Sequence, residues 1–452
     1  MASHMVDSAL FKDQFGTEEM RRTFDDRNLL QKWMDVEAAL ARAEAAVGLI
    51  PRSAAEEISR RCSADLLDVE AIKRGIDETS HPIVPFLHAY KAVCGKEAGE
   101  CLHWGATTQD IIDTGMVLQI REAYDVIQRD VSEIIRIICD MARKYRDTLM
   151  AGRTHGVHAL PITYGFKTAI WACELHRHRE RLRAARPRVL VSSLFGAVGT
   201  LNSFGKDALE IQRLVSEDLG LDVPEISWHS ARDGVAEWTA LLGLLAGTLG
   251  KIANEIINLM KTEVDEVEEP FHHGKVGSST MPHKRNPMIC EAVVAASRIV
   301  RSHVPLALEV MMSEHERDMS AWQAEWEFVP EACTLTGAVL HQMKFVLSNL
   351  IVKPDNMRKN LDALGGLILS EAVMLRLGES IGRQTAHDLV YKISMETFEK
   401  GVPFAELLAK DEKVSAHLSP EEIEGLLDPA NYVDHCGTLV DRAIAVCEAG
   451  SS

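Results

Sequence analysis

Long stretches without proline constrain the fold of this 452-residue chain more than any other feature of its sequence. No proline falls between Pro85 and Pro161, or between Pro224 and Pro270. Proline interrupts a helix because it lacks a backbone N–H and its ring clashes with the preceding turn. Proline-free stretches of this length therefore permit long helices that end close to the flanking prolines.

Apolar side chains in these stretches recur at helical spacing. Along Ile112–Tyr145 they return every three or four residues, which predicts a helix of about ten turns and roughly 50 Å. The run Asp233–Glu269 is apolar on nearly every face and is expected to be buried. A third helical stretch is expected over Thr163–Pro187. Val189–Leu194 is rich in β-formers but short, and strands do not alternate with helices, so an α/β sheet is not expected.

These patterns predict an all-α fold in which long helices form a multi-helix bundle. The surplus of apolar surface indicates association of subunits, although a larger bundle within one chain would also absorb it. We expect three helical domains, namely an N-terminal domain 1–107, a central long-helix domain 108–353 and a C-terminal domain 354–452. The last boundary lies where Lys353-Pro354-Asp355 breaks the chain.

The composition excludes several classes of protein. A net charge of −18 without a basic stripe argues against binding to nucleic acid. No apolar run reaches the ~18 residues of a membrane span, and no signal-peptide pattern opens the chain. The nine cysteines are scattered without a CxxC pair, which is typical of reduced thiols in a cytoplasmic protein. The opening MASHM resembles an expression-vector remnant and is left out of the fold argument.

The loop GKVGSSTMPHKRNP at 274–287 is the strongest candidate for chemistry. It brings together two hydroxyls, two cations and an amide: Ser278, Ser279, Lys284, Arg285 and Asn286. Gly277 permits a tight turn beside them. A serine hydroxyl is a weak base unless neighbouring cations stabilise its alkoxide, and these cations are near in sequence. From the residues alone, a polar loop between helices is an equally good interpretation.

Three further motifs carry polar side chains suited to a site. In AGRTHGVHA (151–159), histidines at His155 and His158 suit proton transfer near neutral pH. Their spacing also fits a metal pair, but no cysteine or carboxylate accompanies them, so no metal is expected. In CLHWGATTQD (101–110), short polar residues precede the long helix, and Thr108 or Asp110 is a candidate N-cap. A helix N-terminus also offers N–H groups to a carboxylate. The third motif is TSHPIVP (79–85).

Residues from about 10 to about 445 resemble the branch of the aspartase/fumarase superfamily that contains adenylosuccinate lyase and 3-carboxy-cis,cis-muconate cycloisomerase. The loop at 274–287 is similar to the superfamily signature. The resemblance to the branch rests on GRTHGVHA, HWGATTQDIIDT and SEHERDMSAW. It implies three helical domains, a homotetramer whose active sites each draw on three subunits, and neither a metal nor an organic cofactor.

The resemblance also implies a mechanism. Ser278 matches the base that removes the proton next to a substrate carboxylate, and Lys284 and Asn286 match the groups that hold the resulting aci-carboxylate dianion. His155 matches the acid that protonates the departing nitrogen. Donors placed where charge develops give a large electrostatic gain. The remaining residues that we assign to substrate binding are His81, His103, Thr107, Thr108, Gln109, Arg153, Thr154 and His158.

The sequence departs from adenylosuccinate lyases where those enzymes contact the nucleotide phosphate. Their N-terminal Arg-Tyr pair is replaced by Phe15-Gly16, and the segment after the HERD motif contains Trp322 and Trp326. Aromatic rings supply neither cations nor N–H clusters for a phosphate. These tryptophans and the segment Trp228–Asp233 are similar to the cycloisomerases, but the bacterial cycloisomerases have tryptophan where this chain has His155.

Our leading hypothesis is a lyase that cleaves a C–N bond of a non-nucleotide N-substituted aspartate and releases fumarate. The expected substrate is a small dicarboxylate or tricarboxylate. The alternatives are 3-carboxy-cis,cis-muconate cycloisomerase and an adenylosuccinate lyase with an atypical phosphate site. A structural role without catalysis, as in the crystallins of this superfamily, is disfavoured by the intact set of Ser278, Lys284, Asn286 and His155.

Overall fold

The computed structural model describes residues 4–271 and 277–449, which are predominantly helical, so the expected all-α fold is confirmed. The chain divides into two compact units. Unit 1 comprises residues 1–131, 178–250 and 292–341, and unit 2 comprises 132–177, 251–291 and 342–452. The homotetramer and the three-domain boundaries stay predictions.

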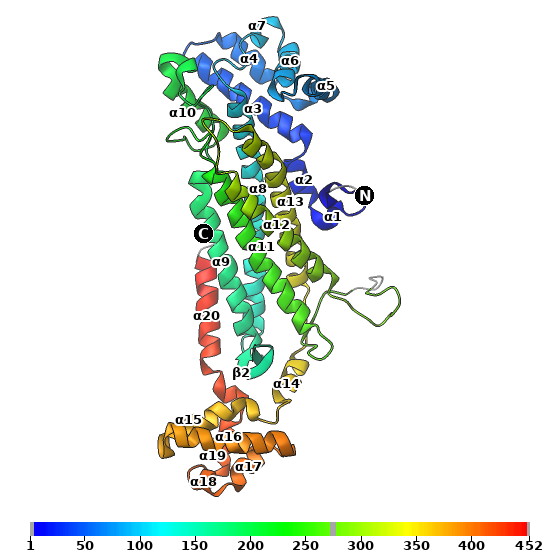
Figure 1. Ribbon diagram of the computed structural model, residues 1–452, viewed down its shortest axis with the longest axis vertical. Helices are drawn as coiled ribbons and strands as arrows, with labels where there is room; N and C mark the ends of the chain where they lie inside the picture. The colour runs from blue at the N-terminus through cyan, green and yellow to red at the C-terminus, as the bar shows by residue number, and fades with distance from the viewer. Residues whose placement is uncertain (1–3, 272–276, 450–452) are drawn as a thin grey trace. The chain divides into compact units, whose positions relative to one another are not determined.

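The longest helices contribute residues to both units. They are α8 (Thr108–Lys144), α9 (Tyr164–Val189), α11 (Asp233–Leu259), α12 (Met288–Glu309) and α13 (Met319–Ser348) (Figure 1). The first confirms the helix predicted from the apolar periodicity, and the second matches the predicted third stretch. The third ends ten residues before the predicted run ends, because the polar residues Lys261-Thr262-Glu263 turn the chain into a short strand.

One of these helices, α11, is long and apolar enough among the described residues to cross a membrane by length and composition. Half of its most apolar window is buried within the described structure. Its inward side chains include Trp238, Leu242 and Leu249, which are almost completely buried.

Unit 1 is organised around α3 (Asp26–Ala46), which begins at an N-cap where the Asp25 carboxylate accepts the backbone N–H of Asn28. Its buried face carries apolar residues such as Met34 and Leu40, together with two fully buried carboxyl groups, Glu37 and Glu44. The other helices of this unit are α1 (Lys12–Phe15), α2 (Glu18–Thr23), α4 (Arg52–Arg60), α5 (Val69–Thr79), α6 (Ile83–Cys94), α7 (Lys96–Gly99) and α10 (Ala208–Leu219).

Unit 2 contains an antiparallel hairpin that the sequence analysis did not predict. Strand β1 (Leu149–Thr154) pairs with β2 (Val157–Thr163), and the register shifts at Gly152. The two turn residues His155 and Gly156 have φ of +55° and +81°, which fits the tight primed turn that joins twisted strands. A second pair joins β3 (Val267–Glu268) to β4 (Ile351–Val352).

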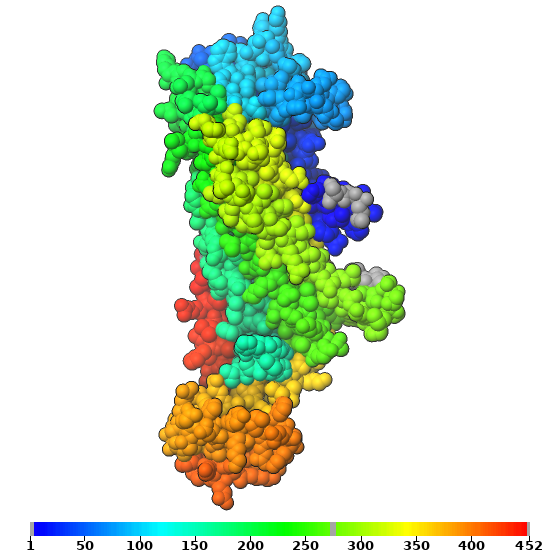
Figure 2. Space-filling view, in the orientation of Figure 1, coloured from blue at the N-terminus to red at the C-terminus, as the bar shows by residue number. Residues whose placement is uncertain are grey.

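The C-terminal part of unit 2 has a hydrophobic core of its own. Phe404, Leu408 and Val414 are fully buried in it with Val373 and Leu377. Figures 1 and 2 show the helices around this core, in orange, as a closely packed group. The helices that follow β4 are α14 (Pro354–Asp362), α15 (Ser370–Ile381), α16 (Arg383–Lys400), α17 (Phe404–Lys410), α18 (Glu412–Ser415), α19 (Pro420–Leu426) and α20 (Asp434–Ala449).

Candidate active site

The β1–β2 hairpin presents His155 at the exposed tip of its turn, with Thr154 also exposed. Arg153 does not lie free beside them. Its guanidinium donates two hydrogen bonds, of 3.0 and 2.6 Å, to the buried carboxylate of Glu266. The Asn360 amide donates to the same carboxylate at 2.9 Å. Arg153 therefore anchors the hairpin, and its predicted contact with substrate stays a prediction.

His158 lies across the hairpin from Arg153. Burial and the positive charge of Arg153 lower the pKa of His158, and the carboxylate of Glu266 only partly opposes them. The imidazole is therefore neutral at neutral pH and can accept or donate a single proton.

A cavity of about 580 Å³ in unit 2 lies beside the tip of the hairpin. Four cationic side chains line it together with Gly156 and Trp171: Arg153, Lys167, Lys251 and Lys261. Lys167 and Lys251 are paired with Glu255 and Glu174 at 2.6 and 2.7 Å. Because Arg153 is paired with Glu266 as well, three of these four cations are already compensated by carboxylates, and we assign no ligand to the cavity.

The signature loop is described from Gly277 onward, and the first three residues of 274–287 lie outside the described residues. The Ser278 Oγ accepts backbone N–H groups from Thr280 at 3.4 Å and Met281 at 3.1 Å. Hydrogen bonds donated to an oxygen favour its anionic form, so these N–H groups favour the alkoxide that a serine base requires. Ser278 is half-buried, whereas Ser279 is exposed.

The backbone of the loop at Gly277 lies very close to its backbone at Lys284. A Cβ at this position would lie 2.2 Å from the carbonyl oxygen of Lys284, which is impossible without movement of the backbone. The Asn286 side chain donates to the Gly277 carbonyl at 2.7 Å and holds the same approach. Figure 2 shows the yellow-green atoms of this segment at the surface, where Lys284 is exposed.

The two cations of the loop differ in their surroundings. Arg285 pairs with Glu268 and stacks over Phe271, 4.4 Å from the ring centroid. No ion pair joins Lys284 to another of the described residues. Its ammonium group is therefore the better placed of the two to bind a carboxylate.

In unit 1, Asp110 organises the segment that begins α8. Its carboxylate accepts the backbone N–H of Thr107 at 2.9 Å and those of Phe195 and Gly196 at 2.8 and 2.9 Å. His229 Nε2 lies 3.0 Å from the same carboxylate. The helix begins at Thr108, so the flanking N-cap position belongs to Thr107 and not to Thr108 or Asp110 as expected. Asp110 instead reaches back to this position from within the first turn.

His81 lies beside Thr108, with 3.4 Å between its Nε2 and the threonine Oγ1. The backbone N–H of Val84 donates to His81 Nδ1 at 3.3 Å. Because Nδ1 accepts, the neutral ring carries its proton on Nε2 and donates to the hydroxyl. The structure therefore brings these two predicted residues together.

Gln109 is almost completely buried, and its side chain is engaged by the protein. Its amide nitrogen donates to the Asp113 carboxylate at 3.1 Å and to the His229 carbonyl at 2.9 Å. Its oxygen accepts from Arg317 at 2.7 Å, and the same guanidinium lies 3.4 Å from Thr107 Oγ1. Arg317 belongs to the HERD motif, but it was not among the site residues predicted from the sequence.

Trp322 takes part in a buried ionic network in unit 1. Its indole N–H donates to Asp113 at 2.7 Å, and Arg232 donates to both oxygens of that carboxylate at 2.7 and 3.1 Å. Arg232 also pairs with Glu325. The Arg232, Asp113 and Glu325 side chains are at most 1% exposed. Burial raises the pKa of Glu325, although the charge and hydrogen bonds of Arg232 oppose the shift.

Comparison with known proteins decides the family. The model of a family described as lyase matches residues 13–301, and a model described as adenylosuccinate lyase C-terminus matches residues 366–443. This chain belongs to the aspartase/fumarase superfamily. Its resemblance to the branch with adenylosuccinate lyase and carboxymuconate cycloisomerase is confirmed, and the chain is a lyase.

Three relatives match this superfamily member over nearly all of its length. N-acetyl-S-(2-succino)cysteine lyase of Dickeya dadantii is 45% identical, with 98% of each chain covered. The protein of the same name from Enterococcus italicus is 42% identical, again over 98% of each. The crystal structure of 3-carboxy-cis,cis-muconate lactonizing enzyme from Pseudomonas putida has a TM-score of 0.92 and 39% identity. That alignment covers 98% of this chain and 100% of the other.

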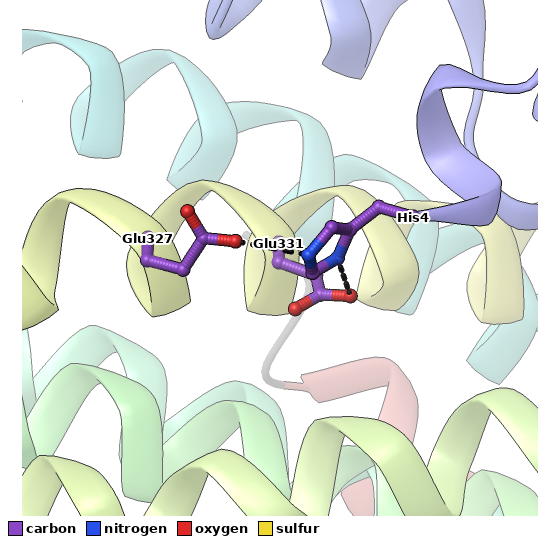
Figure 3. Close-up of side chains that lie close together, drawn as sticks. All are labelled: His4, Glu327 and Glu331. Carbon is purple, nitrogen blue, oxygen red and sulfur yellow. Dashed lines mark hydrogen bonds and ion pairs between the residues drawn. The ribbon is translucent and has the colours of Figure 1, made fainter. Parts of the chain in front are cut away.

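One group of side chains in the described part of this superfamily member has the spacing of a metal site. His4 lies between two carboxylates, with its Nδ1 3.0 Å from Glu331 and its Nε2 3.2 Å from Glu327 (Figure 3). The hydrogen bond with Glu331 and the charges of both carboxylates raise the pKa of His4. A doubly paired imidazolium has no lone pair for a metal. His4 also belongs to the MASHM segment, so we assign no site here.

Proposed function

We propose that this chain cleaves the C–S bond of a 2-succinylated thiol by β-elimination and releases fumarate and the thiol. N-acetyl-S-(2-succino)cysteine is the proposed substrate. The two full-length relatives that carry the name of this activity support the proposal. The leading hypothesis from sequence placed the broken bond at nitrogen, and the proposal moves it to sulfur while keeping the succinyl group and the elimination.

The main structural argument against a nucleotide substrate is a buried network. It consists of Trp322, Asp113, Arg232 and Glu325. The one cation in this network faces two carboxylates, so its charge is already compensated. A phosphate needs uncompensated cations or clustered N–H groups. The network supports a substrate without a phosphate, such as an acylated cysteine.

The proposed reaction begins at the carbon next to the distal carboxylate of the succinyl group. The Ser278 alkoxide, stabilised by its two backbone N–H donors, removes a proton from this carbon. The negative charge moves onto the carboxylate, where Lys284 and Asn286 supply a cation and an amide donor. The electron pair then forms the new C=C bond as the C–S bond breaks, which gives fumarate and a thiolate.

His155 is the proposed proton donor to the leaving group. A thiol has a pKa of about 8.5, so a thiolate can leave without a proton. A departing amine nitrogen must be protonated, because the anion of an amine is a far stronger base than a thiolate. Proton donation therefore contributes less to C–S cleavage than to C–N cleavage. The exposed position of His155 on its turn leaves room for a substrate and for another subunit.

We also propose the assembly that the resemblance implies, a cytoplasmic homotetramer whose active sites are shared between subunits and need no cofactor. Exposed apolar side chains on the long helices, among them Ile170, Leu244, Ile299 and Phe345, support association. The mass of the purified protein by light scattering tests the tetramer.

A panel of substrates tests the reaction. Purified enzyme is incubated with N-acetyl-S-(2-succino)cysteine, an N-substituted aspartate, 3-carboxy-cis,cis-muconate and adenylosuccinate, and products are separated by chromatography. The proposal expects fumarate from the first compound with the highest kcat/KM. C–N cleavage is the second candidate, favoured by His155 as an acid. Lactone as the main product supports the cycloisomerase alternative instead, which the likeness to the P. putida enzyme favours.

A further inference from the structure

Glu37 on α3 holds His103 through two contacts. One carboxylate oxygen lies 2.6 Å from the imidazole Nδ1, and the other accepts the backbone N–H of His103 at 2.9 Å. The Glu37 side chain is completely buried, whereas that of His103 is 19% exposed. A single buried carboxylate thus fixes both the backbone and the ring of a histidine whose side chain is partly exposed.

The backbone of His103 adopts an unfavourable conformation that surrounding contacts must hold in place. Its φ is +60°, in the left-handed region that non-glycine residues generally avoid. Gly105, two residues later, also has positive φ, at +75°. Residues held in such conformations persist only where surrounding contacts over-determine them, and they concentrate at functional sites.

The contacts also set the protonation of the ring. Burial lowers the pKa of His103, but the charge and hydrogen bond of Glu37 and the charge of Asp110 outweigh it, so the pKa is raised. The imidazolium donates Nδ1–H to Glu37 and keeps Nε2–H on the opposite edge of the ring. No protein acceptor for Nε2–H is found among the described residues.

We propose that Glu37 is a positioning residue that fixes the backbone and the ring of His103, with the ring's Nε2–H directed at a carboxylate of the substrate. The inference rests on the proposed function, because it takes His103 as a residue that contacts the succinyl group. It assigns a role to a residue of the N-terminal helices that none of the recognised motifs contains. A charge-assisted bond of this kind is about twice as strong as a neutral one.

Glu44 lies seven residues after Glu37 on the same buried face of α3 and provides a matched control. Neither of its carboxyl oxygens has a hydrogen-bond partner. Burial and the charge of Glu37 raise the pKa of Glu44 to about 9, so at neutral pH it adds no charge near His103. Glu37→Gln and Glu44→Gln therefore make the same replacement at two buried sites, but only Glu37→Gln removes a group that contacts the histidine.

The test measures the binding of fumarate by calorimetry between about pH 6 and about pH 9, on both sides of neutrality. We expect Glu37→Gln to weaken binding at neutral pH by about tenfold, the loss of one charge-assisted contact. We expect Glu44→Gln to bind like the wild type. In steady-state kinetics Glu37→Gln should raise KM more than it lowers kcat, and the pH above which kcat/KM falls should decrease. Equal binding and equal pH profiles in the two variants overturn the proposal.

A second variant keeps the test decisive if Glu37→Gln does not fold. In the wild type, fumarate binding should weaken as pH rises through the raised pKa of His103, and His103→Gln should remove that pH dependence. An unchanged pH dependence in His103→Gln also overturns the proposal. Because fumarate is the probe, a failure to cleave any succinylated thiol contradicts only the proposed substrate, whereas these binding results judge Glu37 separately.

Discussion

The indole N–H of Trp322 donates to Asp113 at 2.7 Å, although 209 residues separate them in the sequence. Asp113 is also bound by Arg232, which pairs in turn with Glu325. One tryptophan thereby joins a network whose single cation is already balanced by two carboxylates. This relationship is one physical reason for proposing a substrate without a nucleotide, as the two tryptophans suggested in the sequence.

The network makes a prediction about stability. Arg232→Met leaves two buried carboxylates without their cation and should destabilise the protein by ~3–5 kcal/mol. Arg188→Met removes a pair with Glu237 in which Arg188 is 57% exposed, and should cost no more than ~1 kcal/mol. Urea denaturation of both variants checks the difference. Similar midpoints for the two variants would contradict the network as described.

Ser278 is expected to be the base. Ser278→Ala should lower kcat by about 10²–10⁴-fold, the usual contribution of a general base, while the thermal unfolding midpoint stays unchanged. The neighbouring Ser279→Ala is the control, because Ser279 is exposed and should keep near-normal turnover. Initial rates of fumarate formation measure both. Near-normal kcat in Ser278→Ala would remove this serine from the base role.

The contribution of His155 to catalysis is expected to depend on the leaving group. His155→Ala should reduce the cleavage of an N-substituted aspartate more than that of a succinylated thiol, because the amine must be protonated as it departs. The ratio of the two losses in kcat/KM is the measured quantity. The control is His417→Ala, which changes an exposed histidine between α18 and α19. Equal losses for both substrates would show that His155 is not the acid.

The helical fold was predictable from sequence because its determinants are local. The proline-free stretches and the three-to-four spacing of apolar residues found α8 and α9 nearly to their ends. The β1–β2 hairpin was missed because its turn depends on positive φ at His155, a residue that propensity does not place there. The sequence predicted a catalytic role for His155 but did not predict its position on the tight turn of a hairpin.

The candidate site was predictable where the motifs are contiguous. Ser278, Lys284 and Asn286 were selected from one loop, but the bond from Asn286 to the Gly277 carbonyl required coordinates. The pairing of Glu37 with His103, across 66 residues, left no sequence signal, because a glutamate within an apolar helix face is not a motif. Long-range pairing of charges depends on the packing of whole helices and is not encoded in local spacing.

The buried carboxyl of Glu44 predicts how stability depends on pH. Its folded pKa is raised from 4.5 to about 9, so the native state keeps a proton that the unfolded chain releases. Stability therefore falls as pH rises between these two values. Glu44→Gln should remove this slope. The stability of the variant relative to the wild type should therefore increase between about pH 5 and about pH 8. Thermal unfolding across that range checks it, with the exposed Glu424→Gln as control. A wild-type slope equal to that of Glu44→Gln would contradict a neutral Glu44.

The most direct test of the account is the stoichiometry of products from N-acetyl-S-(2-succino)cysteine. Fumarate is measured by its absorbance and the thiol by a chromogenic thiol reagent in the same time course. The account predicts that both appear in equal amounts and at equal rates, and that Ser278→Ala abolishes both. The contradicting result is that neither product is released by an enzyme preparation that is otherwise active. Such activity would be the formation of fumarate from an N-substituted aspartate or of lactone from carboxymuconate.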